Sequence, residues 1–222
     1  DIDAISDTLS AAGKIAMDAG QRLSFHPGPF NCLASPNKAT VDKTIAELDA
    51  HALQMDLMGL PASHRAKINI HVGGAYGEHD KAMQRFCNNF ARLGATTRAR
   101  LTVENDDKPS MFSTKMLYNG VSKHIGIPIV FDSHHHELGP QDASYHDAFY
   151  LARDTWNAVN VKQQCHHSNS KKNYEDKSVR ASAHSDWYYT AFENYGEPVD
   201  VVLECKMKEQ ALFKYRKDFA CA

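Results

Sequence analysis

The chain has 222 residues, of which 42% are hydrophobic and 23% are charged, the balance of an ordinary globular protein. Its formal net charge of −2 excludes a generally basic nucleic-acid coat, so an anionic partner must be held by a local patch or by metal ions. No apolar run is long enough for a transmembrane helix, and we therefore expect no membrane partner.

Cysteine usage and the first residues bear on location. The five cysteines are scattered, and no two of them form a CxxC pair, which favours reduced thiols over a disulfide framework or a thiolate zinc site. The chain opens with "DIDAISDTL", without a methionine or a visible signal peptide. We expect an intracellular protein, located in the cytoplasm, the nucleoid or the nucleus, and we expect that its natural start is missing. Nothing in the sequence implies an obligate protein partner.

In chain order, six short β-type runs alternate with amphipathic helical stretches. The runs cover 21–28, 66–74, 98–106, 127–135, 158–168 and 199–206, and the helical stretches cover 3–19, 38–59, 79–93, 110–124, 142–157 and 208–219. Most runs are aliphatic or β-branched on both pleat faces, as in a parallel sheet covered on both sides. The alternation predicts βα units, and without a low-complexity linker we expect one domain.

A metal-competent side chain stands at the end of each run. These side chains are His26, His71, Glu104, Asp132, His166 and Glu204. The carboxyl ends of the strands of a (β/α)₈ barrel converge on one face, where the active site lies. A lone histidine or glutamate at a strand end is more often a cap or a loop residue. Six of them in step with the strand period favour a metal site.

The stretch "FDSHHHELGP" at 131–140 is the densest of these groups. Asp132 and His135 fit the contribution of one strand to the ligand ring. If the strand continues through 135, its alternation turns His134 or His136 away, to pack or to support a ligand. We interpret the remaining histidines, including His167, as helix or loop surface.

Imidazole and carboxylate ligands without thiolate suit Zn²⁺ or Mn²⁺. Six candidate ligands are too many for one tetrahedral ion, so shared carboxylates would hold two or three ions. Such clusters stabilise the attacking and leaving oxygens of a phosphodiester displacement. A sugar isomerisation is the other natural use of a metal-lined barrel mouth.

Seven motifs recur in the order of a known family. They are "SFHPGPF", "INIHVGGAYG", "LTVENDD", "IPIVFDSHHH", "CHHSNS", "AHSDWY" and "VDVVLECKMKEQAL", spread between about residues 20 and 215. Together they resemble the UV damage endonuclease (UvdE) family, TIM-barrel metalloenzymes related to endonuclease IV. The resemblance implies an enzyme that nicks double-stranded DNA 5′ to UV photoproducts and some other lesions. It also implies two or three divalent ions, Mn²⁺ first, with Zn²⁺ or Mg²⁺ as alternatives.

The resemblance also implies roles for residues. It gives the first ion His26, His71 and Glu104, the second ion Glu104, Asp132, His166 and Glu204, and the third ion His135 and His184. Glu104 would bridge two ions, and catalysis would rest on the second set. His184 lies in a loop without a strand signal, so only the resemblance marks it.

Residues that could contact DNA lie around the ligand motifs. After "HPG" stand Pro29 and Phe30, where the family commonly has a polar residue and an aromatic one. The ring of Phe30 could still wedge at a lesion, whereas the polar partner is lost. The glycine-rich turn around Tyr76 could present backbone N–H groups to a phosphate, although a plain tight turn explains it as well.

The loop 169–180 offers further cations. Lys171, Lys172 and Arg180 could contact phosphates there, with a solvated loop as the alternative. The aromatic-rich segment 185–196 reads as a short helix that packs into the core.

Two departures from the family pattern affect the expected fold and chemistry. Gln164 stands where the family usually has a lysine two residues before the histidine of its strand. The first run corresponds to the third strand of the family, so we expect a TIM-type (β/α) barrel with about six of its eight strands. On this view 1–222 is a single barrel domain that lacks its first two βα units. The alternatives are an abasic-site endonuclease, a xylose-isomerase-like sugar isomerase and a catalytically inactive metal-binding fragment.

Overall fold

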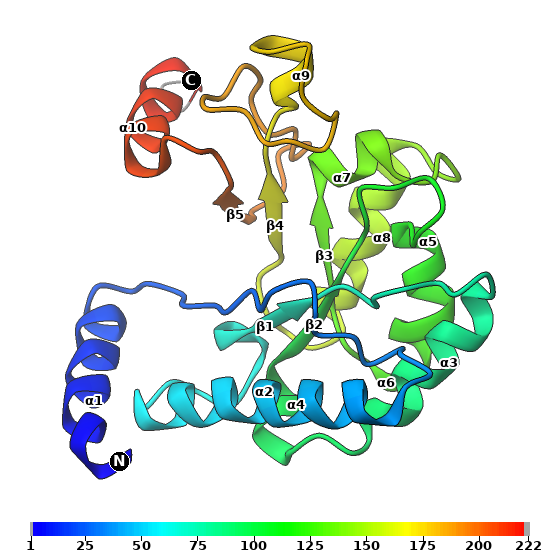
Figure 1. The fold of residues 1–222 in the computed structure, drawn as a ribbon. Helices are drawn as coiled ribbons and strands as arrows, with labels where there is room; N and C mark the ends of the chain where they lie inside the picture. The colour runs from blue at the N-terminus through cyan, green and yellow to red at the C-terminus, as the bar shows by residue number, and fades with distance from the viewer. Residues whose placement is uncertain (1, 220–222) are drawn as a thin grey trace.

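The structure is a computed structural model that describes residues 2–219. Within that range five parallel strands form one sheet in the order β1-β2-β3-β4-β5. The strands are β1 (Ile68–Ile70), β2 (Leu101–Glu104), β3 (Ile129–Asp132), β4 (Gln164–His167) and β5 (Asp200–Leu203). Each strand pairs with the next one along the chain, and Asp132 of β3 lies beside His166 of β4. The sheet is therefore half of a (β/α) barrel (Figure 1).

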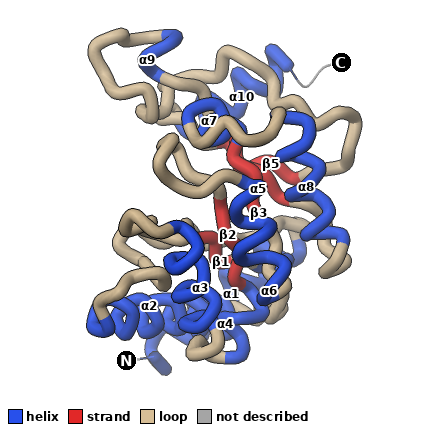
Figure 2. Tube along the Cα trace, turned by 90° about the vertical axis from the view of Figure 1, so that its right-hand side faces the viewer, coloured by secondary structure: helices blue, strands red, loops and turns tan. Residues whose placement is uncertain are grey.

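Helices alternate with the strands along the chain. They are α1 (Ile2–Asp18), α2 (Lys38–Leu57), α3 (His79–Phe90), α4 (Ala95–Arg100), α5 (Thr114–Leu117), α6 (Lys123–Ile125), α7 (Ser133–Leu138), α8 (Tyr145–Asn157), α9 (Lys171–Tyr174) and α10 (Lys208–Phe219), with a 3₁₀ turn η1 (His64–Ala66) and a π-helical turn η2 (Tyr118–Ser122). α3, α5, α6 and α8 lie on one side of the strands in both views (Figures 1 and 2). None of the helices within residues 2–219 is both long and apolar enough to cross a membrane.

The two faces of each strand have different chemistry. In β1 and the two residues after it, Ile68, Ile70 and Val72 join the hydrophobic core under the helices. Asn69 alternates with them and is buried on the concave face. The same alternation places Glu104 on that face. The concave face of the half-barrel is therefore polar and buried, and the arrowheads of β3 and β4 point towards the end that carries α7 and α9 (Figure 1).

The first predicted strand is not a strand. From the run 21–28, only Phe25 pairs with the sheet, in a single bridge to Ile68. Pro27 has no N–H to donate, which disfavours pairing in the part of the run after Phe25. Five strands therefore replace the six that we expected. The α/β half-barrel confirms the coarse fold prediction, while the two missing βα units stay a prediction.

Two other predicted strands are shorter because helices replace their ends. Residues 98–100 belong to α4, where the buried Arg100 pairs with Asp56 at 2.7 Å and donates to the carbonyl of Leu60. Residues 133–135 belong to α7, because the Asp132 carboxylate accepts the His135 N–H at 2.8 Å and caps that helix. The prediction that His134 and His136 alternate as in a strand is therefore wrong, although both are buried.

The predicted short helix at 185–196 is also wrong, since the structure has no helix there. Side chains take the backbone N–H groups that a helix would use. The Glu175 carboxylate accepts from the N–H groups of Asp186 and Trp187, and the side-chain Oδ1 of Asn169 accepts from the N–H of Tyr189. Such side-chain bonds stabilise a loop at the expense of a helix.

Candidate metal centre

Glu104, the last residue of β2, is fully buried and lies at the centre of four histidines. Its Oε2 is 3.1 Å from His26 Nε2 and 3.2 Å from His166 Nδ1. Its Oε1 is 3.2 Å from His135 Nδ1 and 4.0 Å from His71 Nε2. Side chains far apart in the sequence therefore converge as the strand-end pattern predicts.

Neighbouring polar groups fix the Glu104 carboxylate. Asn69 donates its side-chain N–H to Glu104 Oε2, and Thr102 donates to Asn69 Oδ1 at 2.8 Å. Burial alone would raise the pKa of Glu104. The charge of His166 and hydrogen bonds from the surrounding histidines, His135 first, outweigh burial and hold this pKa well below its usual range.

Asp132, His166 and Glu204 complete the centre on the β3 to β5 side. Asn105 binds both backbone groups of Asp132, donating to its carbonyl and accepting its N–H. His166 Nδ1 is 2.9 Å from Glu204 Oε1. Burial lowers the pKa of His166, but the charge of Glu104 and hydrogen bonds to both glutamates outweigh it and raise this pKa to about 9.

Three groups of side chains offer ligand atoms that lie within 4.8 Å of one another. They are His26 with His166 and Glu204, His26 with His71 and Glu104, and Glu104 with Asp132 and His166. Each group mixes imidazole and carboxylate, the ligand chemistry of Zn²⁺ and Mn²⁺.

A further observation supports the binding of metal ions by these donor atoms. Two buried atoms at the centre have no hydrogen-bond partner among the described residues, His71 Nδ1 and Asp132 Oδ2. Buried polar atoms are seldom left without a partner. Such atoms, both of them able to ligate a cation, are what a metal centre requires.

His135 and His184 form a second pair beside this cluster. His135 Nδ1 lies 3.0 Å from the Asn105 carbonyl, and His184 Nδ1 lies 2.8 Å from the Glu204 carbonyl. A ring nitrogen donates to a carbonyl, so each Nε2 stays available to a cation. His134 lies next to both, with ring centroids 6.2 Å from His135 and 5.4 Å from His184. It is fully buried, with neither ring nitrogen paired among the described residues, and burial lowers its pKa to about 4.

His167 is not the surface residue that we expected. It is buried, with Nδ1 2.7 Å from Ser133 Oγ and Nε2 3.0 Å from the Thr190 carbonyl. It belongs to the outer face of β4, which the loop 185–196 covers. Its hydrogen bonds therefore join α7, β4 and that loop.

Sequence reasoning missed two residues of the centre. Lys67 is 1% exposed, and its Nζ lies 3.3 Å from His166 Nε2; burial lowers its pKa to about 8. Asp106 is buried, with Oδ1 3.4 Å from His71 Nδ1, and burial raises its pKa to about 6. The only signals were an isolated charge in "KINI" and a second carboxylate two residues after Glu104.

The structure places the predicted DNA-contacting residues in different surroundings. Pro29 and Arg180 line a cleft of about 720 Å³ together with four of the metal-ligand candidates. Phe30 next to it is 88% exposed, as a wedge requires. Tyr76 is half exposed in a left-handed backbone conformation, and its ring packs under Arg85.

The lysines of the loop 169–180 differ from each other. Lys171 pairs with Asp186 at 2.9 Å and with Glu175 at 3.7 Å, so its charge is largely neutralised. Lys172 is exposed on α9. Lys172 therefore fits phosphate contact better than Lys171 does.

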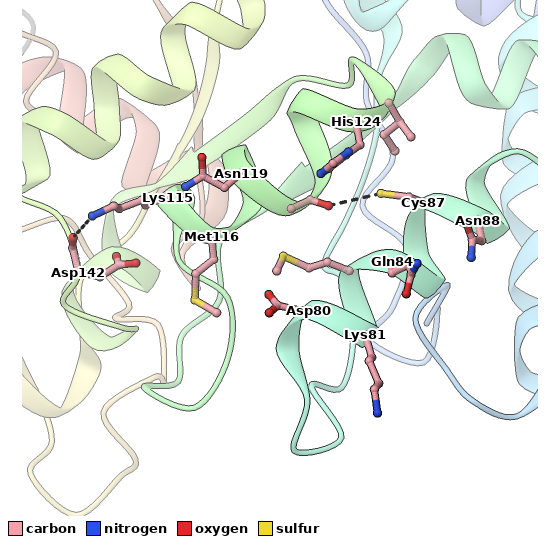
Figure 3. Close-up of a pocket in the computed structure, with 13 residues that line it drawn as sticks. Asp80, Lys81, Gln84, Cys87, Asn88, Lys115, Met116, Asn119, His124 and Asp142 are labelled. Atoms are coloured by element: carbon pink, nitrogen blue, oxygen red, sulfur yellow. Dashed lines mark hydrogen bonds between the residues drawn. The ribbon is translucent and has the colours of Figure 1, made fainter.

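A larger cavity of about 870 Å³ lies elsewhere, in the outer helical layer. Asp80, Lys81 and Gln84 of α3 lie across it from Met116 and Asn119 (Figure 3). No metal-ligand candidate lines it. The size of a cavity therefore does not locate the chemistry of this molecule.

Comparisons with known proteins agree with the motifs. Residues 2–221 match the family model described as UV-endonuclease UvdE. The chain is 35% identical to the UV DNA damage endonuclease of Bacillus pumilus (strain SAFR-032), over 91% of this chain and 63% of that protein. It is 31% identical to the UV-damage endonuclease of Neurospora crassa, over 96% of this chain and 34% of that protein. The chain thus spans less than two thirds of the length of these relatives.

Solved structures show the same relation. The crystal structure of SacUVDE matches with a TM-score of 0.83 and 30% identity, over 99% of this chain and 73% of that chain. A structure of L-ribulose 3-epimerase matches with a TM-score of 0.62 at 14% identity, over 95% of this chain and 72% of that chain. The second likeness extends to the fold alone.

Proposed function

Because the chain belongs to the UV-endonuclease UvdE family, we propose that it is a metal-dependent DNA repair endonuclease. Its substrate is damaged double-stranded DNA, nicked 5′ to UV photoproducts and some other lesions. The observation that carries the proposal is the buried Glu104 with four histidines around it at the carboxyl ends of the strands. A phosphodiester hydrolase of this class needs such a centre.

We assign the side chains to ions as the family motifs imply, and two of the three groups of neighbouring ligand atoms support this assignment. His26, His71 and Glu104 would hold one ion, Glu104, Asp132, His166 and Glu204 a second, and His135 and His184 a third. We propose Mn²⁺, with Zn²⁺ or Mg²⁺ as alternatives. Divalent cations held there would neutralise charge that builds on the phosphodiester and lower the pKa of the attacking water.

The protein's own contribution is to keep these ligands fixed and dry. Glu104, Asp132 and His166 are fully buried, so their charges and dipoles act in a medium of low dielectric. Asn69 and Asn105 hold the two carboxylate residues by hydrogen bonds. We assign the catalytic roles to Glu104, Asp132, His166 and Glu204, with Glu104 shared by two ions.

The DNA would lie over the cleft. Phe30 would fill the gap that a lesion leaves in the base stack, next to Pro29 of the cleft lining. Tyr76, which is half exposed, would also contact the DNA. Lys171, Lys172 and Arg180 would contact phosphates, Lys171 the least because of its ion pairs. The intracellular setting, and a barrel with two further βα units, stay predictions.

One assay separates this function from its alternatives. Labelled duplexes with one cyclobutane dimer, one abasic site or no damage are incubated with metal-stripped protein, with and without Mn²⁺. The proposal predicts Mn²⁺-dependent nicking 5′ to the dimer and none in the undamaged duplex. Nicking of the abasic duplex alone would indicate an abasic-site endonuclease. Mn²⁺ binding without nicking would indicate an inactive fragment, and turnover of a ketose without DNA binding would indicate an isomerase.

A further inference from the structure

The cleft over the metal centre contains two side chains with a permanent positive charge among the described residues that line it, Lys108 and Arg180. Lys108 lies in the loop after β2, and Arg180 lies in the loop between α9 and β5. His26, His71 and Glu204 line the same cleft. The two cations therefore approach the centre from two separate loops.

Neither cation has an ion-pair partner within residues 2–219. Lys108 is exposed although Asp106 and Asp107 line the same cleft. By contrast, Lys171 of α9 pairs with two carboxylates. A cation kept unpaired beside a concave site is free to bind an anion of the substrate.

The backbone holds both residues in place. The Lys108 carbonyl accepts the Met111 N–H at 3.0 Å. The Arg180 carbonyl accepts the Ala183 N–H at 3.1 Å, one residue before His184. Cations on loops that are already ordered lose less entropy when they bind.

We infer that Lys108 and Arg180 form a clamp that binds backbone phosphates on the two sides of the metal centre. The inference rests on the proposed function, since it takes the bound polymer to be the DNA strand that is nicked. The carboxylates of the centre would be neutralised by their own ions, which leaves the neighbouring phosphates without a counter-charge. Lys108 and Arg180 supply it, independently of the base sequence and of the lesion.

The clamp is tested with Lys108→Met, Arg180→Met and the control Lys81→Met. Lys81 is exposed on α3 at the outer cavity (Figure 3), and its removal changes the net charge by the same amount. Specificity constants for nicking by the Mn²⁺-loaded chain are measured against salt concentration. Each clamp variant should lower kcat/KM by about tenfold and reduce the salt slope by about 1. Metal content and the control should stay at wild-type values.

Neutral methylphosphonate linkages, placed one at a time along the damaged strand, identify the phosphates. The wild-type enzyme should lose activity at linkages on both sides of the nick. Lys108→Met should become insensitive at one of these positions and Arg180→Met at another. Wild-type nicking with clamp variants that behave like Lys81→Met would overturn the clamp alone. A wild-type chain that neither binds nor nicks damaged DNA would overturn the clamp and the proposed function together.

Discussion

Replacing Glu104 by glutamine tests the bridging role with little change in shape. The substitution removes one negative charge from a carboxylate that lies 3.1 Å from His26 Nε2 and 3.2 Å from the Nδ1 atoms of His166 and His135. A neutral amide cannot balance the charge of two ions, so both should bind more weakly. The loss of several kcal/mol of charge stabilisation corresponds to a nicking rate lower by a factor on the order of 10³.

The same substitution should also change the pKa of His166 in the metal-free protein. The charge of Glu104 is the largest of the effects that raise the pKa of His166 to about 9. Without it, burial should lower this pKa again, which NMR titration of the imidazole would detect. In the wild type, the rise of the His166 pKa from its ordinary value of 6.5 to about 9 corresponds to a stabilisation of the charged imidazole by at most roughly 3 kcal/mol.

The assay pairs metal content per chain, measured after dialysis against Mn²⁺, with single-turnover nicking of a dimer-containing duplex. Glu209→Gln on the exposed side of α10 is the matched control, because it removes the same charge far from the ligand set. A Glu104→Gln variant that keeps its metal and nicks within tenfold of the wild type would refute the bridging role.

Three further predictions use other residues. In the metal-free protein the raised pKa of His166 stabilises the fold below pH 6.5, and this stability is lost as the pH rises through about 9. Mn²⁺ affinity should rise over the same pH range because the ion displaces a proton. A melting temperature and an Mn²⁺ affinity that do not change with pH would contradict this prediction. Phe30→Ala should weaken binding to the damaged duplex by about 1–3 kcal/mol, and an equal loss on undamaged DNA would count against a wedge. Asp106→Asn should lower Mn²⁺ affinity by about 10–100-fold through His71, whereas unchanged affinity in calorimetry would exclude an orienting role.

The ligand ring could be predicted from the sequence because strand ends in a parallel sheet share one edge. Glu104 and Asp132 end their strands, and His71 and Glu204 directly follow theirs. His184 could not be found in this way, because a loop brings it to the centre through a bridge with Ser170. Only its motif marked it.

Element boundaries failed where long-range contacts decide them. The helical turn before β2 depends on the Arg100–Asp56 pair, which no local pattern reveals. The helix after β3 depends on the cap by Asp132. Sequence reasoning assigned Asp132 only the role of a metal ligand and therefore did not predict the helix. Lys67 was missed because the burial of a charged side chain is a property of the assembled half-barrel.

The most direct test of the central claim is nicking of one duplex that carries a single cyclobutane dimer by metal-stripped chain, to which Mn²⁺ is added back in steps. The account predicts no cleavage without metal, and with metal a single product that ends on the 5′ side of the dimer. It also predicts that activity follows the number of ions bound per chain. Full nicking by chain shown to be metal-free, or saturation with Mn²⁺ without any nick, would contradict it.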